Sequence, residues 1–365
     1  MKQYKALGLM SGTSLDGLDL ALVQFVFQEN CWSFTLIESE TISYDFFWQK
    51  QLENAQNLDS ESLQKLHMDY GHYLGQIAAE FIRQNNIQPD LVASHGHTVF
   101  HNPQQGYTLQ IGAGASIAAH LTCPVVFDFR SEDVALGGQG APLVPIGDEL
   151  LFNDFLACVN LGGFANISIN NDGQRIAWDI GPANFILNAI SRKLGYDFDE
   201  NGNLARQGQL NQKVLKALNA LDYYHKPTPK SMGREWVEEV LWPEIKTFQL
   251  SDSDLLRTFV EHISYQVSEA INGLQGKVLF SGGGVRNGFL MERITALSKA
   301  QIVIPEEDIV DFKEAIIFAF MGVLRMENKV NILNSVTGAS HSISAGSIVG
   351  KSLKEDNYSA ESYIN

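Results

Sequence analysis

Apolar runs separated by glycine turns open the chain. The segments Tyr4–Leu9, Leu18–Phe27 and Trp32–Ile42 are rich in leucine, valine and aromatic side chains, a composition typical of strands. A glycine-rich turn joins the first two segments, and the polar residues Gln28–Asn30 join the second to the third. This pattern predicts an antiparallel meander of three strands.

A helical pattern follows this meander. Apolar side chains recur at three- and four-residue spacing through Leu63–Asn85, and Pro89 and the short apolar stretch DLVASHG come next. The stretches SIAAHL and PVVFDF repeat the order of helix and then strand. The first half is therefore predicted to be β-rich at its start and alternating afterwards.

The second half begins with the same pattern as the first. Phe155–Asn170 consists of an apolar run, a glycine turn and another apolar run, and a third run, QRIAWDIG, follows. KVLFSGGGVRN reads as a strand that enters a glycine turn. Helices are predicted at Asn184–Leu194, Gln209–Leu221, Asp252–Leu274 and Glu314–Met326. The repeated meander predicts an internally duplicated α/β protein, and the alternative is two unrelated sheets that both contain a hairpin.

Composition narrows the class of protein. A chain of 365 residues with 45% hydrophobic residues can bury two cores, so two domains are expected. The net charge of -16 argues against nucleic acid and anionic lipid surfaces as partners. No stretch of 18 apolar residues is present, which predicts a cytoplasmic protein without a membrane span. The cysteines are predicted to be reduced and buried: Cys31, Cys123 and Cys158.

The turn of the first predicted hairpin has the composition of a phosphate-binding loop. Its small and hydroxyl-bearing residues would let backbone and side-chain donors approach phosphate oxygens: Gly12, Thr13, Ser14 and Gly17. Asp16 and Asp19 could hold a hydrated Mg²⁺ beside those phosphates. The alternative is an ordinary hairpin whose aspartates bond to backbone amides.

Two further glycine turns follow predicted strands in the second half. Their polar and glycine residues are Asn160, Gly162, Gly163, Asn166, Gly282, Gly283 and Gly284. Three such turns would suit a nucleotide in a cleft, with two loops on its phosphates and the third near its adenosine. Each turn taken alone could be only a turn.

Asp179 ends an apolar strand and is followed at once by Gly181 and Pro182. A carboxylate in this position can take a proton from a hydroxyl group or a water, and the alternative is a turn aspartate bonded to its own backbone. His95, His97 and His101 have no acidic or thiol partners nearby in the sequence, so polar ligand-facing or hydrogen-bonded core histidines are preferred to a metal site.

Three basic residues are candidates for anion binding. Arg130 could bind a ligand carboxylate through two hydrogen bonds, or could pair with Asp128 or Asp133. Lys230 and Arg234 lie in a locally basic stretch of an acidic protein, which suits an anionic ligand, although solvated loop charge is the common alternative.

Together these stretches resemble one known family over nearly the whole chain. The motifs, in family order, are GLMSGTSLDGLD, SHGHTVFHNP, DFRSEDVALGGQGAPLVP, NLGGFANIS, DIGPAN, PKSMGRE, SGGGVRN and DFKEAIIFAF. This set resembles the 1,6-anhydro-N-acetylmuramic acid kinases of the sugar kinase, Hsp70 and actin superfamily. The resemblance implies a duplicated two-domain actin-like ATPase fold, related to ribonuclease H, with ATP and Mg²⁺ in an interdomain cleft. It also implies a homodimer, with domain I formed by residues 1–127 and 343–365 and domain II by residues 128–342.

The resemblance also implies a reaction and the residues that perform it. The family opens the 1,6-anhydro bridge of its amino sugar with water and phosphorylates the sixth oxygen to give N-acetylmuramic acid 6-phosphate, in cell-wall recycling. Asp179 corresponds to the general base, Gly12–Asp19 to the first phosphate loop, Asn160–Asn166 to the second and Gly282–Gly284 to a loop near the nucleoside. The sugar-side candidates are Glu314, His95, Arg130, Lys230 and Arg234.

Several positions and alternatives qualify this assignment. Four residues depart from the expected family pattern: His97, Ile180, Ala183 and Met232. They concern the sugar site, so a related anhydro sugar is an alternative substrate. A nucleotide-gated binding module and a metal-dependent peptidase or carbamoyl-transfer protein on the same fold are alternatives of other classes.

Overall fold

The chain divides into two compact units in a computed structural model that describes residues 1–12 and 15–350. The first unit is formed by residues 1–151 and the chain from Glu314 onward, and the second by Phe152–Lys313. These bounds differ from the expected domain boundaries at 127/128 and 342/343. Residues 128–151 and 314–342 lie with the first unit, because the helices in them pack on the first sheet and on one another.

The first unit contains a six-stranded sheet in the order β13-β7-β4-β1-β2-β3. Its strands are β1 (Lys2–Ser11), β2 (Gly17–Gln28), β3 (Cys31–Ser43), β4 (Leu91–Ser94), β7 (Val125–Phe127) and β13 (Ser347–Val349). The strands β1, β2 and β3 form the predicted antiparallel meander, β4 and β7 continue the sheet in parallel, and β13 closes the edge in the antiparallel sense.

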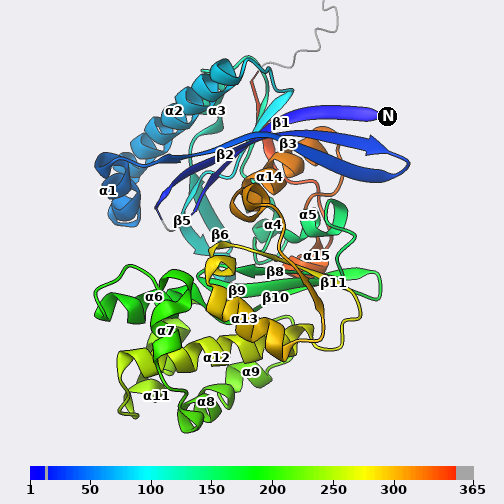
Figure 1. Cartoon of the computed structure of the whole chain (residues 1–365). Helices are drawn as coiled ribbons and strands as arrows, with labels where there is room; N and C mark the ends of the chain where they lie inside the picture. The colour runs from blue at the N-terminus through cyan, green and yellow to red at the C-terminus, as the bar shows by residue number, and fades with distance from the viewer. Residues whose placement is uncertain (13–14, 351–365) are drawn as a thin grey trace, which may run out of the picture. The chain divides into compact units, whose positions relative to one another are not determined.

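The helices of this unit pack on its sheets or on one another. They are α1 (Phe46–Asn54), α2 (Ser60–Asn85), α3 (Gly114–Ala118), α4 (Ser131–Ala135), α5 (Pro145–Leu150), α14 (Glu307–Met326, of which residues 307–313 belong to the second unit) and α15 (Asn334–Thr337), with short 3₁₀ turns η1 (Ala55–Asn57) and η2 (Pro103–Gln105). The long helix α2 begins where the Asp59 side chain accepts the amides of Glu61 and Ser62, and it ends at Asn86 in the left-handed conformation. Figure 1 shows α2 and α14 beside the strands of this unit.

Strand β1 is buried on both of its faces. Leu7 and Leu9 belong to a core cluster that includes Tyr70 and Leu74 of α2. Gly8, which lies between them and points the other way, faces α14 so closely that a Cβ atom there would be 1.9 Å from the carbonyl oxygen of Ala315. This double burial explains why β1 reads as a nearly continuous apolar run.

A second, two-stranded sheet in this unit was not predicted. It consists of β5 (His97–Asn102) and β6 (Tyr107–Ile111), joined by η2. Its strands carry mixed polar and apolar side chains that are mostly half-buried, so they lack the strong apolar pattern of the central strands.

The second unit contains a five-stranded sheet in the order β10-β9-β8-β11-β12. Its strands are β8 (Ala157–Leu161), β9 (Phe164–Asn171), β10 (Gln174–Pro182), β11 (Lys277–Ser281) and β12 (Gln301–Val303). The strands β8, β9 and β10 are an antiparallel meander, and β11 and β12 run parallel to β8.

The two sheets repeat one topology. In both, three consecutive strands form a meander, and two later strands are added in parallel on the other side of the first strand. The resulting order 3-2-1-4-5, with only the second strand reversed, is therefore present twice. The predicted duplicated α/β fold is confirmed.

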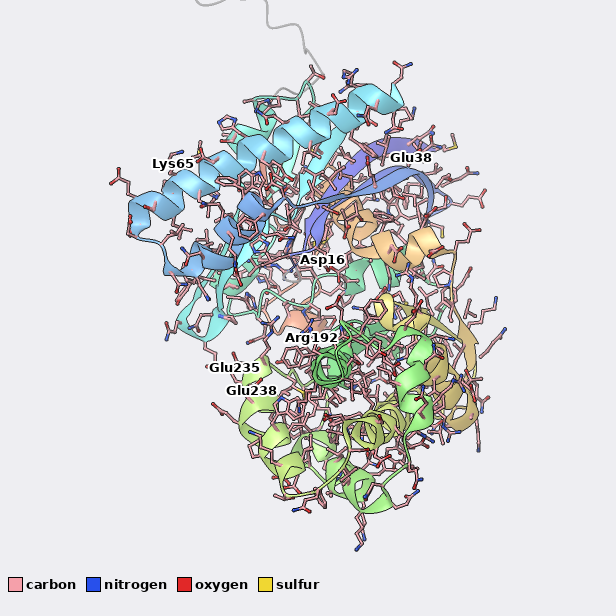
Figure 2. The ribbon with its side chains drawn as sticks, turned by 60° about the vertical axis from the view of Figure 1, so that its left-hand side comes forward. Asp16, Glu38, Lys65, Arg192, Glu235 and Glu238 are labelled. Atoms are coloured by element: carbon pink, nitrogen blue, oxygen red, sulfur yellow. The ribbon has the colours of Figure 1, made fainter. Side chains whose placement is uncertain are left out.

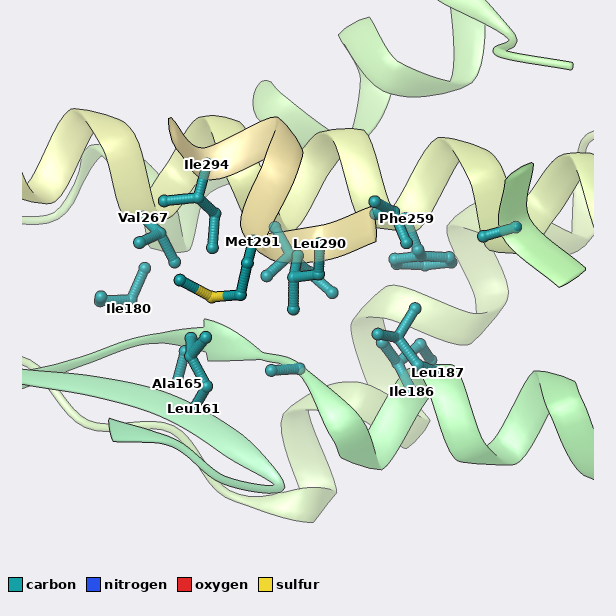
Figure 3. Close-up of a cluster of buried hydrophobic side chains, with 14 of the residues drawn as sticks. Leu161, Ala165, Ile180, Ile186, Leu187, Phe259, Val267, Leu290, Met291 and Ile294 are labelled. Carbon is teal, nitrogen blue, oxygen red and sulfur yellow. The ribbon is translucent and has the colours of Figure 1, made fainter. Parts of the chain in front are cut away.

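Most helices of the second unit lie between β10 and β11 in the sequence, and the last helix and the last short turn follow β11. They are α6 (Asn184–Lys193), α7 (Asn203–Gln207), α8 (Gln212–Asn219), α9 (Asp222–His225), α10 (Arg234–Trp236), α11 (Trp242–Lys246), α12 (Asp252–Ile271) and α13 (Gly288–Leu297), with short turns η3 (Glu200–Gly202), η4 (Val237–Leu241, a π-helix) and η5 (Gly283–Arg286). Figure 3 shows the core that this unit builds between its strands and α12 and α13, where Ile180, Phe259 and Met291 are among the buried side chains.

The predicted strands and the longer helices are confirmed, with bounds that shift by a few residues. The last predicted helix begins at Glu307 rather than Glu314. Cys123 and Cys158 are buried as expected, but Cys31 is exposed, because it lies at the turn where β3 begins. Within residues 1–12 and 15–350, no helix is both long and apolar enough to cross a bilayer.

Candidate functional site

The register of the second sheet brings Asp179 beside two predicted phosphate-loop residues. Asp179 pairs with Asn166 of β9, and Asn166 pairs with Asn160 of β8. Ser281, the last residue of β11, pairs with Asn160 on its other side. Directly paired residues in a sheet point to the same face, so these four side chains form one row.

This row faces away from the hydrophobic core. Val159, Leu161 and Ile167, which alternate with the asparagines along their strands, are buried in the core cluster. Asn160 and Asn166 are only partly buried. The alternation of strand side chains therefore presents the polar row on the sheet face opposite α12 and α13.

A β-bulge ends the row at Asp179. The register of β10 against β9 shifts between Asp179 and Gly181, so that Ile180 is the extra residue. Ile180 is 4% exposed and packs in the core, which anchors the bulge. Bulges of this kind redirect a neighbouring side chain, and here the neighbour is the predicted base.

Three hydrogen bonds join Asp179 to the segment Tyr223–Met232. The Met232 amide donates to Asp179 Oδ2 (2.9 Å), and the Tyr223 hydroxyl donates to the Asp179 carbonyl oxygen (2.7 Å). The Asp179 amide donates to the Lys230 carbonyl oxygen (3.0 Å). Oδ1 is left as the carboxylate oxygen without a hydrogen-bond partner among the described residues.

Burial sets the proton affinity of this carboxylate. It raises the pKa of Asp179 above the ordinary value of 3.8, and the Met232 hydrogen bond partly offsets the rise. A raised pKa makes the carboxylate a stronger base. Behind the bulge, Tyr224 and His262 line a cavity of only about 10 Å³, which holds at most one water molecule, so a sugar cannot approach Asp179 from that side.

Two glycine loops of the second unit adjoin the row. The tip of the β8–β9 hairpin is tied to the start of α6, where the amides of Ala183 and Phe185 donate to the carbonyl oxygen of Gly163. A Cβ atom at Gly162 or Gly163 would meet nothing closer than 3.5 Å. Gly282 has a φ of 80°, and a Cβ atom there would lie 2.1 Å from Asn160 Oδ1. Glycine is therefore required at 282, where the third loop touches the row.

The remaining glycines of the third loop differ from one another. Gly283 has open space beside it, with nothing within 4 Å of an added Cβ atom. Gly284 is buried against Leu161. The structure thus leaves the backbone at Gly283 accessible at the end of β11.

The basic side chains of Lys230 and Arg234, after α9, contact other residues of the second unit. Lys230 Nζ donates to the carbonyl oxygens of Tyr223 (2.9 Å) and Tyr224 (3.3 Å) and lies 4.7 Å from the centre of the Tyr223 ring. The exposed Arg234 lies over the ring of Phe185. The exposed residues Glu235 and Glu238 follow it on the surface (Figure 2).

In the first unit, the structure brings His95, Arg130 and Glu314 together. His95 donates from Nδ1 to the carbonyl oxygen of Gly96 (2.9 Å), and its Nε2 accepts from Arg130 Nε (2.9 Å). Arg130 also donates to the Gly140 carbonyl oxygen (2.6 Å), and its charge interacts with that of Glu314. The guanidinium therefore donates hydrogen bonds to an imidazole and a backbone oxygen, and it interacts with Asp133 through charge alone.

Burial controls the charges in this group. It lowers the pKa of His95 well below the ordinary value, and the Arg130 charge lowers it further. His95 is thus neutral and serves as an acceptor. Burial also lowers the pKa of Arg130 to about 10, with Glu314 opposing the shift, so Arg130 remains a cation at neutral pH.

The first glycine loop lies between β1 and β2. Gly12 follows β1, Asp16 is exposed in the turn (Figure 2), and Gly17 begins β2 against the Ile42 carbonyl oxygen. Asp19, opposite Thr41 in the sheet, accepts the Thr41 hydroxyl (2.6 Å). Thr13 and Ser14 lie outside the described residues.

A buried hydroxyl network supports the start of this loop. Tyr44 donates to Ser11 Oγ (2.7 Å) and bonds to Tyr70 (2.6 Å), and Ser11 Oγ lies 2.9 Å from His97 Nδ1. Burial lowers the pKa of His97 to about 4, so this histidine is neutral and belongs to the network rather than to a metal site. Among the described residues, no group of three histidine, cysteine or acidic side chains is placed to hold a metal.

Sequence reasoning missed the residues that surround Asp179. Tyr223, Tyr224 and His262 lie far from Asp179 in the sequence and belong to no recognisable motif. His262 does carry a signal, because it occupies a core position of the amphipathic helix α12, where a polar side chain needs a buried partner. Its partners are Asn219 Oδ1 (2.6 Å) and the Tyr224 hydroxyl (2.9 Å).

Comparison with known proteins identifies the family of this chain. Residues 4–351 match the family model described as "Anhydro-N-acetylmuramic acid kinase". The chain is 34% identical to the anhydro-N-acetylmuramic acid kinase of Pasteurella multocida, over 94% of this chain and 96% of that protein. It is 33% identical to the Vibrio cholerae protein of the same name, over 94% of this chain and 97% of that protein. The chain therefore belongs to the anhydro-N-acetylmuramic acid kinase family.

Proposed function

We propose that this protein is an ATP-dependent kinase that opens the anhydro ring of 1,6-anhydro-N-acetylmuramic acid with water and yields N-acetylmuramic acid 6-phosphate in cell-wall recycling. The observation that carries the proposal is the arrangement at Asp179. A carboxylate whose pKa is raised by burial adjoins a row of phosphate-loop residues; Met232 holds one of its oxygens, and no residue within 1–12 or 15–350 bonds to the other.

The chemistry that this arrangement supports is proton removal from water. Asp179 takes a proton from a water molecule whose oxygen bonds to the anomeric carbon, and the bond from that carbon to the sixth oxygen breaks. The sixth oxygen bonds to the γ-phosphorus of ATP as the bond to the ADP oxygen breaks. One water and one ATP are consumed for each sugar phosphate and ADP formed.

The polar residues of the second unit suit the nucleotide. Asn160 and Asn166 side chains and the open backbone at Gly162, Gly163 and Gly283 can donate hydrogen bonds to phosphate oxygens or ribose hydroxyls. In the first unit, Gly12 and Gly17 bracket the loop that we assign to the phosphates. We also assign Thr13 and Ser14 to this loop from the family motif.

The sugar carries a carboxylate and an amide, and the first unit offers matching groups. Arg130 is a cation held in place by His95 and Gly140, which suits a carboxylate. Glu314, beside Arg130, can accept a hydrogen bond from a sugar hydroxyl or amide. In the second unit, Arg234 is an exposed cation that can attract an anionic ligand.

Mg²⁺ fits the residues at the first loop. The ion is commonly bound by one or two carboxylates together with substrate phosphates, and Asp16 in the turn and Asp19 in β2, three residues later, supply carboxylates. When bound, Mg²⁺ would neutralise part of the phosphate charge. The family resemblance also supports a cytoplasmic homodimer, and light scattering should then give twice the 40.5 kDa mass of one chain.

The test is turnover of the purified protein with Mg²⁺-ATP and the anhydro sugar in ¹⁸O-labelled water. We expect sugar-dependent ADP release and a sugar phosphate that carries one solvent oxygen. Asp179→Asn should lower kcat by about 100- to 10,000-fold, the usual contribution of a general base, with ATP affinity nearly unchanged. Near-normal turnover by Asp179→Asn would remove Asp179 from its role, and no ADP release with the sugar would refute the kinase assignment.

The alternatives of other classes lack comparable support. A nucleotide-gated binding module needs no base, so the raised pKa and the bulge at Asp179 would have no use there. A metal-dependent peptidase needs a histidine-rich metal site, and His95 and His97 are engaged by Arg130 and Ser11. A kinase of a related anhydro sugar remains a matter of substrate choice, which the same assay resolves with other anhydro sugars.

A further inference from the structure

Four hydrogen bonds join Asp179, Tyr223, Lys230 and Met232. The Lys230 ammonium donates a hydrogen bond to the Tyr223 carbonyl oxygen, and the Tyr223 hydroxyl donates one to the Asp179 carbonyl oxygen. The Asp179 amide in turn donates to the Lys230 carbonyl oxygen. These three bonds make a closed circuit. The fourth bond, from the Met232 amide to Asp179 Oδ2, is made by the same segment two residues after Lys230.

We infer that this circuit, which we call the Asp179 clamp, positions the base, and that Lys230 and Tyr223 are positioning residues of the reaction rather than sugar contacts. The inference rests on the proposed function of Asp179 as the base. It reassigns Lys230, whose cationic side chain first suggested contact with an anionic substrate.

The clamp is needed because the bulge interrupts the regular hydrogen bonding of β10 with β9. At a bulge the extra residue leaves the ladder, so the peptide group between Asp179 and Ile180 is not held by regular pairing with β9. The Tyr223 hydroxyl supplies a hydrogen bond to the carbonyl oxygen of that peptide group. Because Tyr223 is 3% exposed, this bond is shielded from water and fixes the orientation of the peptide group.

The Lys230 side chain links α9 to the backbone segment that makes the other hydrogen bonds of the clamp. Its ammonium donates to the carbonyl oxygens of Tyr223 and Tyr224 in the short helix α9, and the Tyr223 oxygen also accepts the Lys226 amide (3.2 Å). This contact fixes the distance between α9 and the backbone at residues 230–232. The Lys230 carbonyl and the Met232 amide are thereby placed on either side of Asp179.

The clamp also selects the oxygen that reacts. With Oδ2 held by the Met232 amide, Oδ1 is the oxygen that can take the proton, and rotation of the carboxylate would cost that hydrogen bond. A shift of about 1 Å in a reacting group can cost on the order of 100-fold in rate. Loss of the clamp should therefore lower kcat while substrate binding is kept.

The experiment compares Lys230→Met with Lys226→Met. Both variants remove one positive charge from the same segment, but Lys226 is exposed and is not part of the clamp. We expect Lys230→Met to lower kcat by about tenfold or more, with the KM values for sugar and ATP unchanged. Lys226→Met should leave kcat and KM as in the wild type.

A second pair tests the hydroxyl of the clamp. Tyr223→Phe removes the bond to the Asp179 carbonyl, whereas Tyr224→Phe removes a buried hydroxyl that bonds to His262 instead. Tyr223→Phe should lower kcat several-fold more than Tyr224→Phe, and both should fold, because each keeps its ring. The decrease in kcat at low pH should occur at a different pH in Tyr223→Phe and Lys230→Met, because the burial and hydrogen bonding of Asp179 change in these variants. It should occur at the wild-type pH in Lys226→Met and Tyr224→Phe.

Hydrogen exchange separates this inference from the proposed function. In Lys230→Met, faster amide exchange is expected in peptides that contain Asp179 and Met232, whose amides the clamp uses, and this readout needs no turnover. Unchanged exchange there would overturn the clamp even in an active enzyme. A raised KM for the sugar with unchanged kcat in Lys230→Met would overturn it in favour of a sugar contact. If the wild type shows no turnover, the kinase assignment fails while the exchange data still decide whether Lys230 holds Asp179.

Discussion

At the scale of single residues, burial changes what the histidines of this protein can do. His95, His97 and His262 are each at most 5% exposed, and burial is the largest cause of the lowered pKa at each of them. Each is therefore neutral at physiological pH and hydrogen-bonded to a neighbour. They are structural acceptors and donors, and their proton uptake becomes a cost of folding at low pH.

His262 gives a direct test of this cost. Its pKa is lowered from 6.5 to about 3 in the folded protein, so between these values the unfolded chain binds the proton and the folded protein does not. Stability should consequently fall as the pH falls below about 6.5, by roughly 2 kcal/mol from this residue at pH 5. In His262→Gln, the loss of unfolding free energy between pH 7 and pH 5 should be smaller by about this amount.

Urea unfolding at the two pH values measures the effect. The exposed His225 provides the matched substitution, and His225→Gln should keep the pH dependence of the wild type. Equal pH dependence in His262→Gln and the wild type would show that His262 is not a buried neutral group.

At the scale of elements, two glycines determine how closely the helix α14 packs on the first sheet. The backbone of α14 approaches β1 at Gly8, and Gly322 of the same helix approaches Ala93 of β4, where an added Cβ atom would be 2.7 Å from the Ala93 Cβ atom. The two glycines lie on opposite partners in the same helix–sheet contact. The contact therefore depends on glycine from both sides.

Gly8→Ala should disrupt this contact. The new Cβ atom would lie 1.9 Å from a backbone oxygen of Ala315, so α14 or β1 must move. Overpacking of this kind costs about 1 to 3 kcal/mol, occasionally more, in unfolding free energy. Gly283→Ala is a suitable comparison for stability, because open space surrounds Gly283, and it should change the unfolding free energy by less than about 0.5 kcal/mol. A wild-type unfolding midpoint for Gly8→Ala would contradict the close approach.

The sequence predicts those elements whose pattern of apolar runs and turns lies within one short stretch of the chain. The two meanders were predicted because apolar runs and glycine turns alternate within about 40 residues, and the pairing of Asp179, Asn166 and Asn160 follows once the meander is known. The β5–β6 hairpin was missed because its side chains are half-buried and mixed in polarity. The role of Gly8 could not be predicted, since its contact lies on a helix at the other end of the sequence.

The same limit applies to the candidate site. Asp179 stands out in the sequence because it ends an apolar strand before Gly181 and Pro182. Tyr223 does not stand out, and Lys230 stands out only as a candidate for anion binding, because an intervening helical region separates both residues from Asp179. Their contribution depends on three-dimensional contacts that spacing does not encode.

At the scale of the whole molecule, the two units differ in how the chain builds them. The second unit is a continuous segment, Phe152–Lys313, whose core cluster consists of residues from that segment. The first unit needs residues 1–151 and also the later chain that supplies α14 and β13. These units differ from the domains expected from the sequence, in which residues 128–151 and 314–342 were placed with the second domain.

This difference predicts the behaviour of fragments. Residues 152–313 expressed alone should fold, with a helical circular dichroism spectrum and one cooperative urea transition, because their sheet and core are complete. Residues 1–151 alone should lack a cooperative transition, because the faces of β1 and β4 that receive α14 are then uncovered. A non-cooperative 152–313 fragment would show that its core depends on the first unit.

The split first unit also sets an order of events during translation. The faces of β1 and β4 are synthesised early, but α14, which covers them, and β13, which completes the sheet beside β7, follow only after the whole second unit. At about 5 to 20 residues per second, the second unit takes on the order of 10 to 30 s to synthesise. For that time the nascent chain carries an open apolar sheet face on the ribosome, so its yield in the cell should depend on chaperones that bind such surfaces before α14 emerges.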